Sequence, residues 1–401
     1  MPEVLFALQA KTGEDTVIYL DNSATTRPFD SVIDSMARMM RDAYFNASAA
    51  YAPALDVERE VRACRAAIAK EVGAQEGDVI FTSGGTESDN LAILGTAQMM
   101  RPGGNFVYSA VEHPAVAQTI GRVERMGFET RVLPVDMRGM VDLEAASRII
   151  DEHTALVSCM QVSNETGAIQ PVGALSALAK TKNPAALIHV DGVQGFMRVP
   201  MHMQRMGVDL YSLSGHKIHG PKGIGALVAR KNVRLMPQQT GGGQERGLRS
   251  GTTDSPAIAG LHAAVREMAA RRGEIEGMRA LKERLIARLN EAGMEAFFVN
   301  GPAPGDAESA PHVLSLSFEG VRGEVLRNAL EGEGVLVSTG SACSSHRQKV
   351  SDVLRAMGLT TEQADGTIRV SLGLFNTAEE IDEAAARMAK LCAMLRRYRR
   401  R

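Results

Sequence analysis

The chain has 401 residues, of which 44% are hydrophobic, and its formal net charge is −2 with acidic and basic residues interspersed. This length and hydrophobic content suffice for a large core and for roughly two to three domain-sized units. The near-neutral balance excludes the basic field that indicates a nucleic-acid partner, and no apolar stretch approaches the ~20 residues of a membrane-spanning helix.

Short apolar, β-rich runs alternate with helical patterns through the first two thirds of the chain. Several runs lack the alternation of a half-exposed strand, which indicates strands buried on both faces of a mostly parallel sheet. The repeated strand–helix order predicts an α/β layered domain. The expected strands are VIFTSG (79–84), NFVYSAV (105–111), TALVSCMQVS (154–163), ALIHVD (186–191), VDLYSLS (208–214) and IGALVAR (224–230), and the expected helices are 87–100, 114–126 and 142–151.

The pattern changes near residue 265. Apolar residues then recur at helical spacing inside a charged segment, and the Pro/Gly-rich loop NGPAPGDAESAP follows. HVLSLSF, a helix near 323–332, VLVSTG, TIRVSLGLF and a terminal helix from about 377 complete a smaller α+β unit. We therefore expect a large α/β domain over 18–265 and a small α+β domain over 266–401, to which residues 1–17 also belong.

A lysine follows one of the expected strands in YSLSGHKIHGPKGIG (211–225). Strand ends of open α/β sheets are where ligands bind. Lys217 alone would be an ordinary solvated cation, but upstream HVDGVQG places Asp191 at the end of another apolar strand, with Gln194 after it. A buried carboxylate needs a cationic partner. A Schiff-base lysine with an acidic partner for a pyridinium nitrogen is the pattern of pyridoxal phosphate enzymes.

A phosphate site for such a cofactor is expected in FTSGGTESDN. A strand leads into Ser83-Gly84-Gly85-Thr86 before a helix begins, and glycines together with a helix N-terminus favour an anion. Most Gly-Gly pairs are only turns, so this signal is weak alone. AVEHPAV adds His113 before a proline that can open a helix, and QVSNETGAIQP ends a strand with Asn164. The glycine loop GGGQERGLRSGTTD (241–254) suits closure over a ligand or a subunit boundary.

One cysteine lies in a stretch that reads as a surface loop. In VLVSTGSACSSHRQKV, Cys343 follows small residues and precedes polar, basic ones, whereas structural thiols usually lie in apolar runs. No cysteines form a C-x-x-C pair, so we expect no metal site. The other three are expected to be structural: Cys64, Cys159 and Cys392. Sparse cysteines and the lack of a basic n-region in the first 15 residues favour the cytoplasm.

Together these motifs resemble the cysteine desulfurases of the class V aminotransferase group. The resemblance runs from IYLDNSATTRP (18–28) to IRVSLGLFNTAEEID (368–382). FTSGGTESDN, SNETGAIQP, SGHKIHGPKGIGAL, GGGQERGLRSGT and STGSACSS occur in the family's order. It implies fold type I of the pyridoxal phosphate-dependent transferases, with a mostly parallel sheet of the seven-stranded type and a smaller α+β domain.

The resemblance also implies a role for each site residue. Lys217 would hold the cofactor and move the substrate Cα proton, while Asp191 would pair the pyridinium nitrogen. His113 would stack on the ring, and Asn164 and Arg369 would hold the substrate carboxylate. The remaining cofactor contacts would come from Gln194 at the ring hydroxyl, from Gly85, Thr86, Ser214 and His216 at the phosphate, and from Thr252 at the phosphate of the neighbouring subunit in a homodimer.

The resemblance assigns the loop cysteine a reaction. The substrate would be L-cysteine, and the thiolate of Cys343 would attack the substrate's sulfur, so that the protein keeps a persulfide and L-alanine leaves. The persulfide would pass to an acceptor protein, either an iron–sulfur scaffold or a dedicated carrier. The sequence STGSAC is similar to that of the family members with a long loop around this cysteine.

The chain departs from the family's usual sequence in three places. FNASAAYAPAL lacks the Pro and His that usually follow Asn46. The alanine that usually follows the cofactor-binding aspartate is Gly192, a one-methyl change that we expect to be tolerated. SSHRQKVSD, after Cys343, is more basic than usual. The resemblance implies that FNASAAYAPAL lies near the active-site entrance used by the substrate and that SSHRQKVSD lies where the acceptor would bind.

Two alternatives stay open from the sequence. A related lyase could act on selenocysteine or another β-substituted amino acid, but such an enzyme has less use for the loop thiol of Cys343. A catalytically idle scaffold is the other alternative, and the retained Lys217, Asp191, His113 and Arg369 argue against it.

Overall fold

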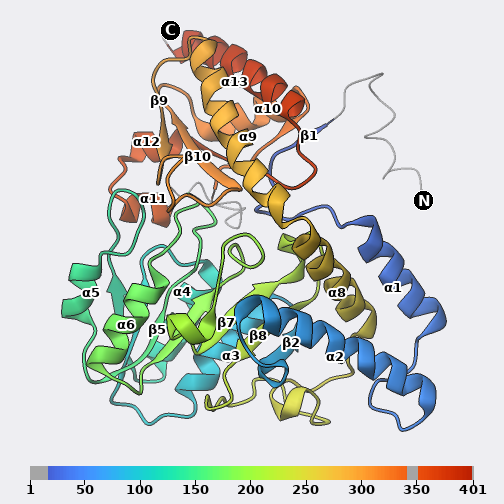
Figure 1. The fold of residues 1–401 in the computed structure, drawn as a ribbon. Coiled ribbons are helices and arrows are strands. Elements are labelled where there is room, and N and C mark those ends of the chain that lie inside the picture. The colour runs from blue at the N-terminus through green and yellow to red at the C-terminus, as the bar shows by residue number, and fades with distance from the viewer. Residues whose placement is uncertain (1–16, 341–350, 400–401) are drawn as a thin grey trace.

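The computed structural model describes residues 17–340 and 351–399. Figure 1 shows a large body around strands such as β5, β7 and β8, and a smaller one around β9 and β10 that helices α9, α10 and α13 cover. No helix in the described part of the chain is long and apolar enough to cross a membrane.

Among the described residues, seven strands form the large sheet. Neighbouring strands from β7 to β4 are parallel, whereas β8 runs antiparallel to both β7 and β2. The predicted fold class, α/β with a mostly parallel sheet, is thus confirmed. In spatial order the strands are β2 (Val79–Thr82), β8 (Gly225–Ala229), β7 (Leu210–Ser214), β6 (Leu187–Asp191), β5 (Thr154–Ser158), β3 (Asn105–Ser109) and β4 (Glu129–Leu133).

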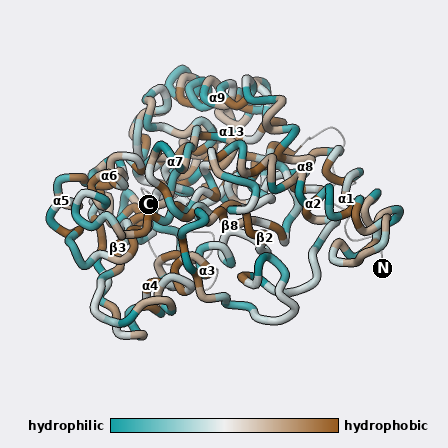
Figure 2. Tube along the Cα trace, turned by 60° about the horizontal axis from the view of Figure 1, so that its bottom comes forward, coloured by the Kyte–Doolittle hydropathy of each residue, from teal (hydrophilic) through white to brown (hydrophobic). Residues whose placement is uncertain are grey.

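Both faces of this sheet are buried, as the continuous apolar runs predicted. Side chains alternate across a strand, so Val79 and Phe81 join one hydrophobic cluster while Ile80 joins another. Helices α3 and α4 cover the face that carries Ile80, and α2, α6 and α8 cover the other. Figure 2 shows the contrast in hydropathy: β8 is brown, whereas hydrophilic residues dominate α9.

The helices begin and end where local chemistry requires it. Helix α2 has a proline in its first turn and ends at Gly73, whose φ of 66° lies in the left-handed region that glycine tolerates. Asp142 caps α5 by accepting two backbone N–H groups. The helices of the large body are α1 (Asp30–Asp42), α2 (Ala52–Val72), α3 (Gly85–Ala97), α4 (Pro114–Arg125), α5 (Leu143–Ile149), α6 (Val172–Lys182), α7 (Met203–Met206) and α8 (Ser255–Ala270).

The smaller body is built on an antiparallel sheet in which β10 (Val313–Phe318) lies between β9 (Phe297–Asn300) and β12 (Thr367–Ser371). Its helices are α9 (Arg272–Glu291), α10 (Gly323–Gly332), α11 (Asp352–Ala356), α12 (Thr361–Asp365) and α13 (Ala378–Arg399). The short strand β1 (Ile18–Tyr19) pairs in parallel with β11 (Val335–Leu336). The described part of the chain therefore begins beside the smaller body before it enters the larger one.

The sequence missed β4 and made most strands too long. β4 reads ETRVL, is partly exposed, and lies at the edge of the sheet, so its polar residues hid it. The expected strand 154–163 stops at Ser158, and the following residues form the loop that carries Asn164. The division at residues 265 and 266 stays a prediction; that position falls inside α8.

The space around Gly192 is limited by one neighbouring side chain. An ideal Cβ at Gly192 would lie 1.9 Å from Cζ of Tyr211, far inside van der Waals contact. Tyr211 is fully buried in β7, and its hydroxyl donates a hydrogen bond of 2.7 Å to Oε1 of Gln161. The tyrosine ring thus fills the volume that a larger residue at position 192 would need.

We expect Gly192→Ala to lower the thermal unfolding midpoint, because overpacking a core typically costs about 1–3 kcal/mol. Replacing Tyr211 with the narrower, flexible Met in the same chain should recover part of the loss. Circular dichroism melts of both singles and of the double variant would measure this. Simple addition of the two single losses would contradict the packing argument.

Candidate functional site

The carboxyl ends of the parallel strands meet at one edge of the large sheet. Asp191 is the last residue of β6 and Ser214 the last of β7. The loops after β2, β3 and β5 leave from the same edge and carry the other predicted residues, 84–86, 113 and 164. This is the edge at which open α/β sheets bind ligands.

Lys217 ends the short 3-10 turn Gly215–Lys217 that follows β7. Its Nζ donates hydrogen bonds to the main-chain oxygens of Ser23 and Ala24. The lysine is thus held against the segment that follows β1. An amine that is held by neutral carbonyls, and that lies in a partly buried position, suits a covalent or proton-transfer role.

Asp191 lies at the base of this site. It is 6% exposed, and its Oδ1 accepts the Val193 N–H at 2.9 Å. Burial raises the pKa of Asp191 to about 6, and the charge of nearby Asp89 adds to the effect while His113 opposes it. A carboxylate in this environment gains from a cationic N–H partner.

The glycines after β2 form a close-packed cradle. Gly84 has a φ of 153°, which favours glycine, and it precedes the N-terminus of α3 at Gly85. An ideal Cβ at Gly84 would lie 3.7 Å from Oγ of Ser214, and one at Gly85 would lie 2.4 Å from a methyl of Val193. The predicted phosphate residues Gly85, Thr86 and Ser214 therefore adjoin one another beside a helix N-terminus, where an anion is favoured.

His113 immediately precedes α4 and caps it. Its Nδ1 accepts the Ala115 N–H at 3.1 Å, which places the ring proton of the neutral form on Nε2. Burial and the charge of Lys217 lower the pKa of His113, and the charge of Asp191 opposes them. His113 and Thr86 line one groove, so the ring lies beside the predicted phosphate cradle.

The side chains of His216 and Gln194 meet the same N-terminal segment. Nδ1 of His216 is 3.2 Å from Oγ1 of Thr25, and burial is the main cause that lowers the pKa of His216 to about 4. Nε2 of Gln194 donates to the main-chain oxygen of Ser23 at 3.0 Å. The main-chain oxygen of Ser23 therefore accepts hydrogen bonds from both Gln194 and Lys217.

Arg369, in β12, approaches from the smaller body. One terminal nitrogen donates to Asp21 at 2.7 Å and the other to the main-chain oxygen of Asn164 at 3.0 Å. The side chain is 4% exposed, and its Nε is buried without a hydrogen-bond partner among the described residues. The structure thus joins Asn164 and Arg369, and leaves a cationic donor that an anion can satisfy.

These residues fit pyridoxal phosphate. The buried carboxylate of Asp191 suits the cationic ring nitrogen, and the Gly84–Gly85 cradle at the start of α3 suits the phosphate. Lys217 lies near Gln194, through their shared acceptor Ser23, and Gln194 offers an amide to a ring oxygen.

The structure describes Thr252 away from this site and does not describe Cys343. Thr252 is exposed in the segment ahead of α8, and no hydrogen bond between described residues joins it to Lys217 or to the glycine cradle. Cys343 lies outside the described residues. Cys64, Cys159 and Cys392 are buried, as predicted, and burial raises the pKa of all three thiols.

Sequence reasoning missed a buried polar chain beneath Asp191. Nδ1 of His189 lies 2.8 Å from Oγ of Ser158, and its Nε2 lies 3.1 Å from Oγ of Ser212 and 3.5 Å from Oδ1 of Asp89. Burial lowers the pKa of His189 to about 4 and raises that of Asp89 to about 7. The sequence did carry a signal for this chain of contacts, because polar residues occur inside strands that are otherwise apolar and buried.

Family and sequence comparisons agree with this geometry. The family model described as "Aminotransferase class-V" matches residues 18–384. The chain is 40% identical over 382 residues to the "Putative cysteine desulfurase IscS 1" of Bacillus subtilis, covering 94% of this chain and 99% of that one. It is 41% identical over 390 residues to the "Cysteine desulfurase IscS" of Escherichia coli strain K12, covering 94% and 93%.

Solved structures show the same likeness in three dimensions. A protein described as "NIFS-LIKE PROTEIN" superposes with a TM-score of 0.87 at 35% identity, over 94% of this chain and all of that one. One described as "SspA in complex with cysteine" superposes with a TM-score of 0.76 at 32% identity, over 90% of this chain and all of that one. The whole arrangement of the two bodies is therefore shared with these proteins.

The buried His189 should make the protein acid-sensitive. Its folded pKa of about 4 is below the ordinary value of 6.5, so the unfolded chain binds a proton that the folded chain refuses between these values. Stability is therefore retained above pH 6.5 and lost as pH falls toward 4, by at most about 1.4 kcal/mol per pH unit. We expect the melting temperature of His189→Gln to fall less between pH 7 and pH 5 than that of the wild type.

The exposed His153 offers a matched control, because its side chain is 69% exposed. Thermal melts of His153→Gln should follow the wild-type pH dependence. Parallel curves for wild type and His189→Gln would contradict the assignment of His189 as a buried neutral base.

Proposed function

The chain belongs to the class V aminotransferases and, within them, to the cysteine desulfurases, and from this premise we propose how its residues divide the conversion of L-cysteine to L-alanine. The cofactor is pyridoxal 5′-phosphate. The observation that carries the assignment of roles is the meeting of Lys217, Asp191 and Arg369 at the carboxyl edge of the large sheet.

We assign the cofactor's contacts to the residues of that edge. Asp191 would pair the ring nitrogen, His113 would stack on the ring, and Gln194 would donate to the ring oxygen. Gly85, Thr86, Ser214 and His216 would hold the phosphate. When bound, the cofactor supplies an electron sink for the bond that breaks at the substrate's Cα.

Lys217 would hold the cofactor and move the Cα proton of the substrate. Its Nζ donates to the main-chain oxygens of Ser23 and Ala24, which hold the amine in place. The amine must leave these carbonyls in order to act. The neutral His113, whose ring proton is on Nε2, is a second group that can exchange a proton over the cofactor.

Arg369 and Asn164 receive the substrate carboxylate. The guanidinium is fixed by Asp21 and by the main-chain oxygen of Asn164, and its unpartnered Nε offers a donor in a dry environment. A charge-assisted bond there is stronger than in water. This pair fixes which side of the amino acid faces Lys217.

Cys343 takes the sulfur. Its thiolate attacks the sulfur of the bound substrate, the sulfur–carbon bond breaks with its electrons left on the carbon, and the new sulfur–sulfur bond is the persulfide. A proton then completes L-alanine. The persulfide passes to an acceptor protein, which is a scaffold for iron–sulfur assembly or a dedicated carrier.

We further propose a homodimer in which Thr252 of the partner subunit completes the phosphate site. The exposure of Thr252 in a glycine-rich loop supports this, because the residue is available to another subunit. The three buried thiols, none in a disulfide, suit the reducing cytoplasm that the sequence favours.

The first experiment is incubation of the purified, cofactor-loaded protein with L-cysteine and a reducing thiol. We expect alanine and sulfide in equal amounts over many turnovers. Cys343→Ser should keep the cofactor's visible absorbance and lose turnover, Lys217→Ala should lose both, and Cys64→Ala, altered far from the site, should keep both.

Unchanged turnover in Cys343→Ser would contradict the persulfide step and favour a lyase acting on selenocysteine or another β-substituted amino acid. A colourless wild type that stays colourless with added pyridoxal phosphate would favour the idle scaffold. Alanine formation by the wild type excludes the scaffold.

Arg369→Lys should raise KM for L-cysteine by roughly 10- to 100-fold with a smaller change in kcat. Lysine keeps the charge but cannot contact Asp21, Asn164 and a carboxylate at once. Steady-state kinetics would measure this, with Arg322→Lys, an exposed arginine paired to Asp365, as control. An unchanged KM would remove Arg369 from the carboxylate site.

A further inference from the structure

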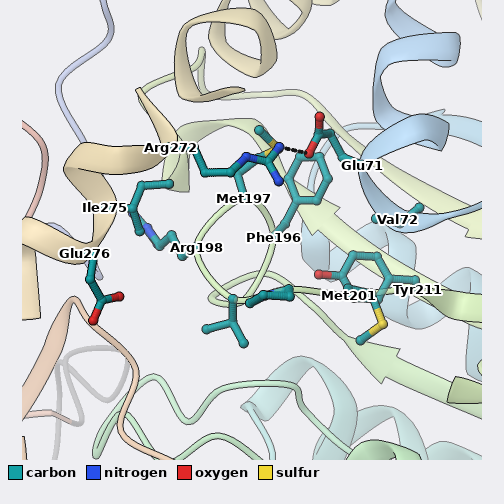
Figure 3. A pocket seen from close by; sticks show the side chains of 12 residues that line it. Glu71, Val72, Phe196, Met197, Arg198, Met201, Tyr211, Arg272, Ile275 and Glu276 are labelled. Carbon is teal, nitrogen blue, oxygen red and sulfur yellow. Dashed lines mark hydrogen bonds and ion pairs between the residues drawn. The ribbon is translucent and has the colours of Figure 1, made fainter. Parts of the chain in front are cut away.

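A pocket lies between the loop after β6, the end of α2 and the start of α9. Among its lining residues are Phe196, Arg198, Met201, Tyr211 and Ile275. Figure 3 shows Arg272 joined to Glu71 on one wall, at 2.6 Å, while Arg198 comes from the loop. The two arginines of this pocket thus have different environments.

Arg198 is a buried cation held by neutral groups. It is 6% exposed; one terminal nitrogen donates to Oε1 of Gln194 at 3.3 Å, and the other donates to the main-chain oxygen of Lys217. Within residues 17–340 and 351–399, no carboxylate oxygen lies within 4.0 Å of it. Burial lowers the pKa of Arg198 to about 9. A buried cation that has no carboxylate partner among the described residues costs folding free energy, and this points to a functional role.

The backbone beside Arg198 is also constrained. Met197 has a φ of 63°, a left-handed conformation that side chains rarely adopt. Arg198 therefore leaves the loop in a direction that the surrounding contacts enforce. One of its hydrogen bonds stays within the loop after β6, at Gln194, and the other joins that loop to the turn after β7, which carries Lys217.

The contacts of Gln194 settle which way its amide points. Oε1 accepts from Arg198 and, at 3.3 Å, faces Nε2 of His312, while Nε2 donates to the main-chain oxygen of Ser23. A guanidinium can only donate and a carbonyl can only accept, so the amide cannot be flipped. Its remaining N–H is thus available to the ring oxygen of the cofactor.

We propose that Arg198 is a positioning residue for the reaction, which holds the Gln194 amide with its N–H toward the cofactor's ring oxygen and anchors the turn that carries Lys217. This inference rests on the proposed function, because it needs the cofactor roles of Gln194 and Lys217. Arginine is suited to the task, since its planar fork reaches two acceptors at once whereas lysine offers a single point charge.

Other charged and titratable groups face the same region. Lys217 is on the turn itself, Lys222 follows it, and Arg369 approaches from β12. Burial is the main cause that lowers the pKa of His216 and His219 to about 4 and the pKa of His312 well below its ordinary value, and the charge of Arg198 adds to each. Burial thus favours the neutral form of these three rings around Lys217, and the charge of Arg198 acts in the same direction.

The test compares Arg198→Met, Arg198→Lys and the control Arg272→Met, which alters the other arginine that lines the pocket. Each protein is loaded with pyridoxal phosphate, and its visible absorbance is titrated against pH without substrate. Arg198→Met should raise the pH at the midpoint of this absorbance titration by roughly 0.5 pH unit or more. The reason is that a nearby cation and an ordered N–H donor are lost. Arg198→Lys should move the midpoint less, and Arg272→Met not at all.

Retention of the cofactor gives a second readout. Arg198→Met should raise the dissociation constant of pyridoxal phosphate roughly tenfold, by the loss of two charge-assisted contacts. In a Gln194→Ala background the same substitution should shift the midpoint by less than it does alone, because part of its effect is exerted through the amide. If the shift caused by Arg198→Met were the same with and without Gln194→Ala, the effect would not act through the Gln194 amide and the inference would fail.

The outcomes separate the two proposals. If the wild type produces alanine and Arg198→Met differs from it only in melting temperature, Arg198 is structural and this inference fails. If the wild type binds the cofactor but produces no alanine, and Arg198→Met still shifts the midpoint of the absorbance titration, the positioning role of Arg198 stands and the proposed reaction fails. Equal shifts in Arg198→Met and Arg272→Met would also overturn it, as a general effect of the pocket's charge.

Discussion

The main-chain oxygen of Ser23 accepts hydrogen bonds from Nζ of Lys217 and from Nε2 of Gln194. Ser23 lies just after β1, which pairs with β11, and its own N–H donates to Oγ of Ser371 in β12. One short segment therefore ties the strand ends of the large sheet to both sheets of the smaller body. The relative position of lysine and glutamine depends on it.

This arrangement explains why the site is built from both bodies. The large sheet supplies Asp191, Ser214 and the glycine cradle, and the smaller body supplies Arg369, whose guanidinium contacts Asp21 two residues before Ser23. A displacement between the bodies would separate Arg369 from Asn164, which follows β5. Geometry at the substrate carboxylate and at the lysine is thus set by the same N-terminal segment.

The sequence predicted the sheet well because its signal is physical. Strands buried on both faces must be apolar throughout, and β2, β5, β7 and β8 are fully buried. The edge strand β4 escaped because an edge permits Glu129 and Arg131. The residues that end the strands were predictable too, since polar side chains after apolar runs mark the ligand edge of such a sheet.

What the sequence could not show is contact between main chain and side chain. A carbonyl such as that of Ser23 has no residue-type signature, because every residue carries one. Arg198 in RVP reads as one more arginine of a mixed-charge surface, and only its burial and its bond to the Lys217 oxygen single it out. His189 was likewise hidden inside LIHVD, where a polar residue in an apolar run needs partners from three elements that are distant in sequence.

Buried charge is distributed unevenly about Lys217. Asp89, Glu112 and Asp191 lie on the side of β6 and α3, and burial raises the pKa of each carboxyl. Arg198 and Arg369 lie on the side of the N-terminal segment. Because the interior screens charge weakly, this separation favours a bound molecule with a cationic ring nitrogen toward the acids and anionic oxygens toward the arginines. Such a ligand satisfies charges that the protein alone leaves poorly compensated, so the desolvation that destabilises the empty fold becomes binding free energy when the cofactor and an amino acid arrive.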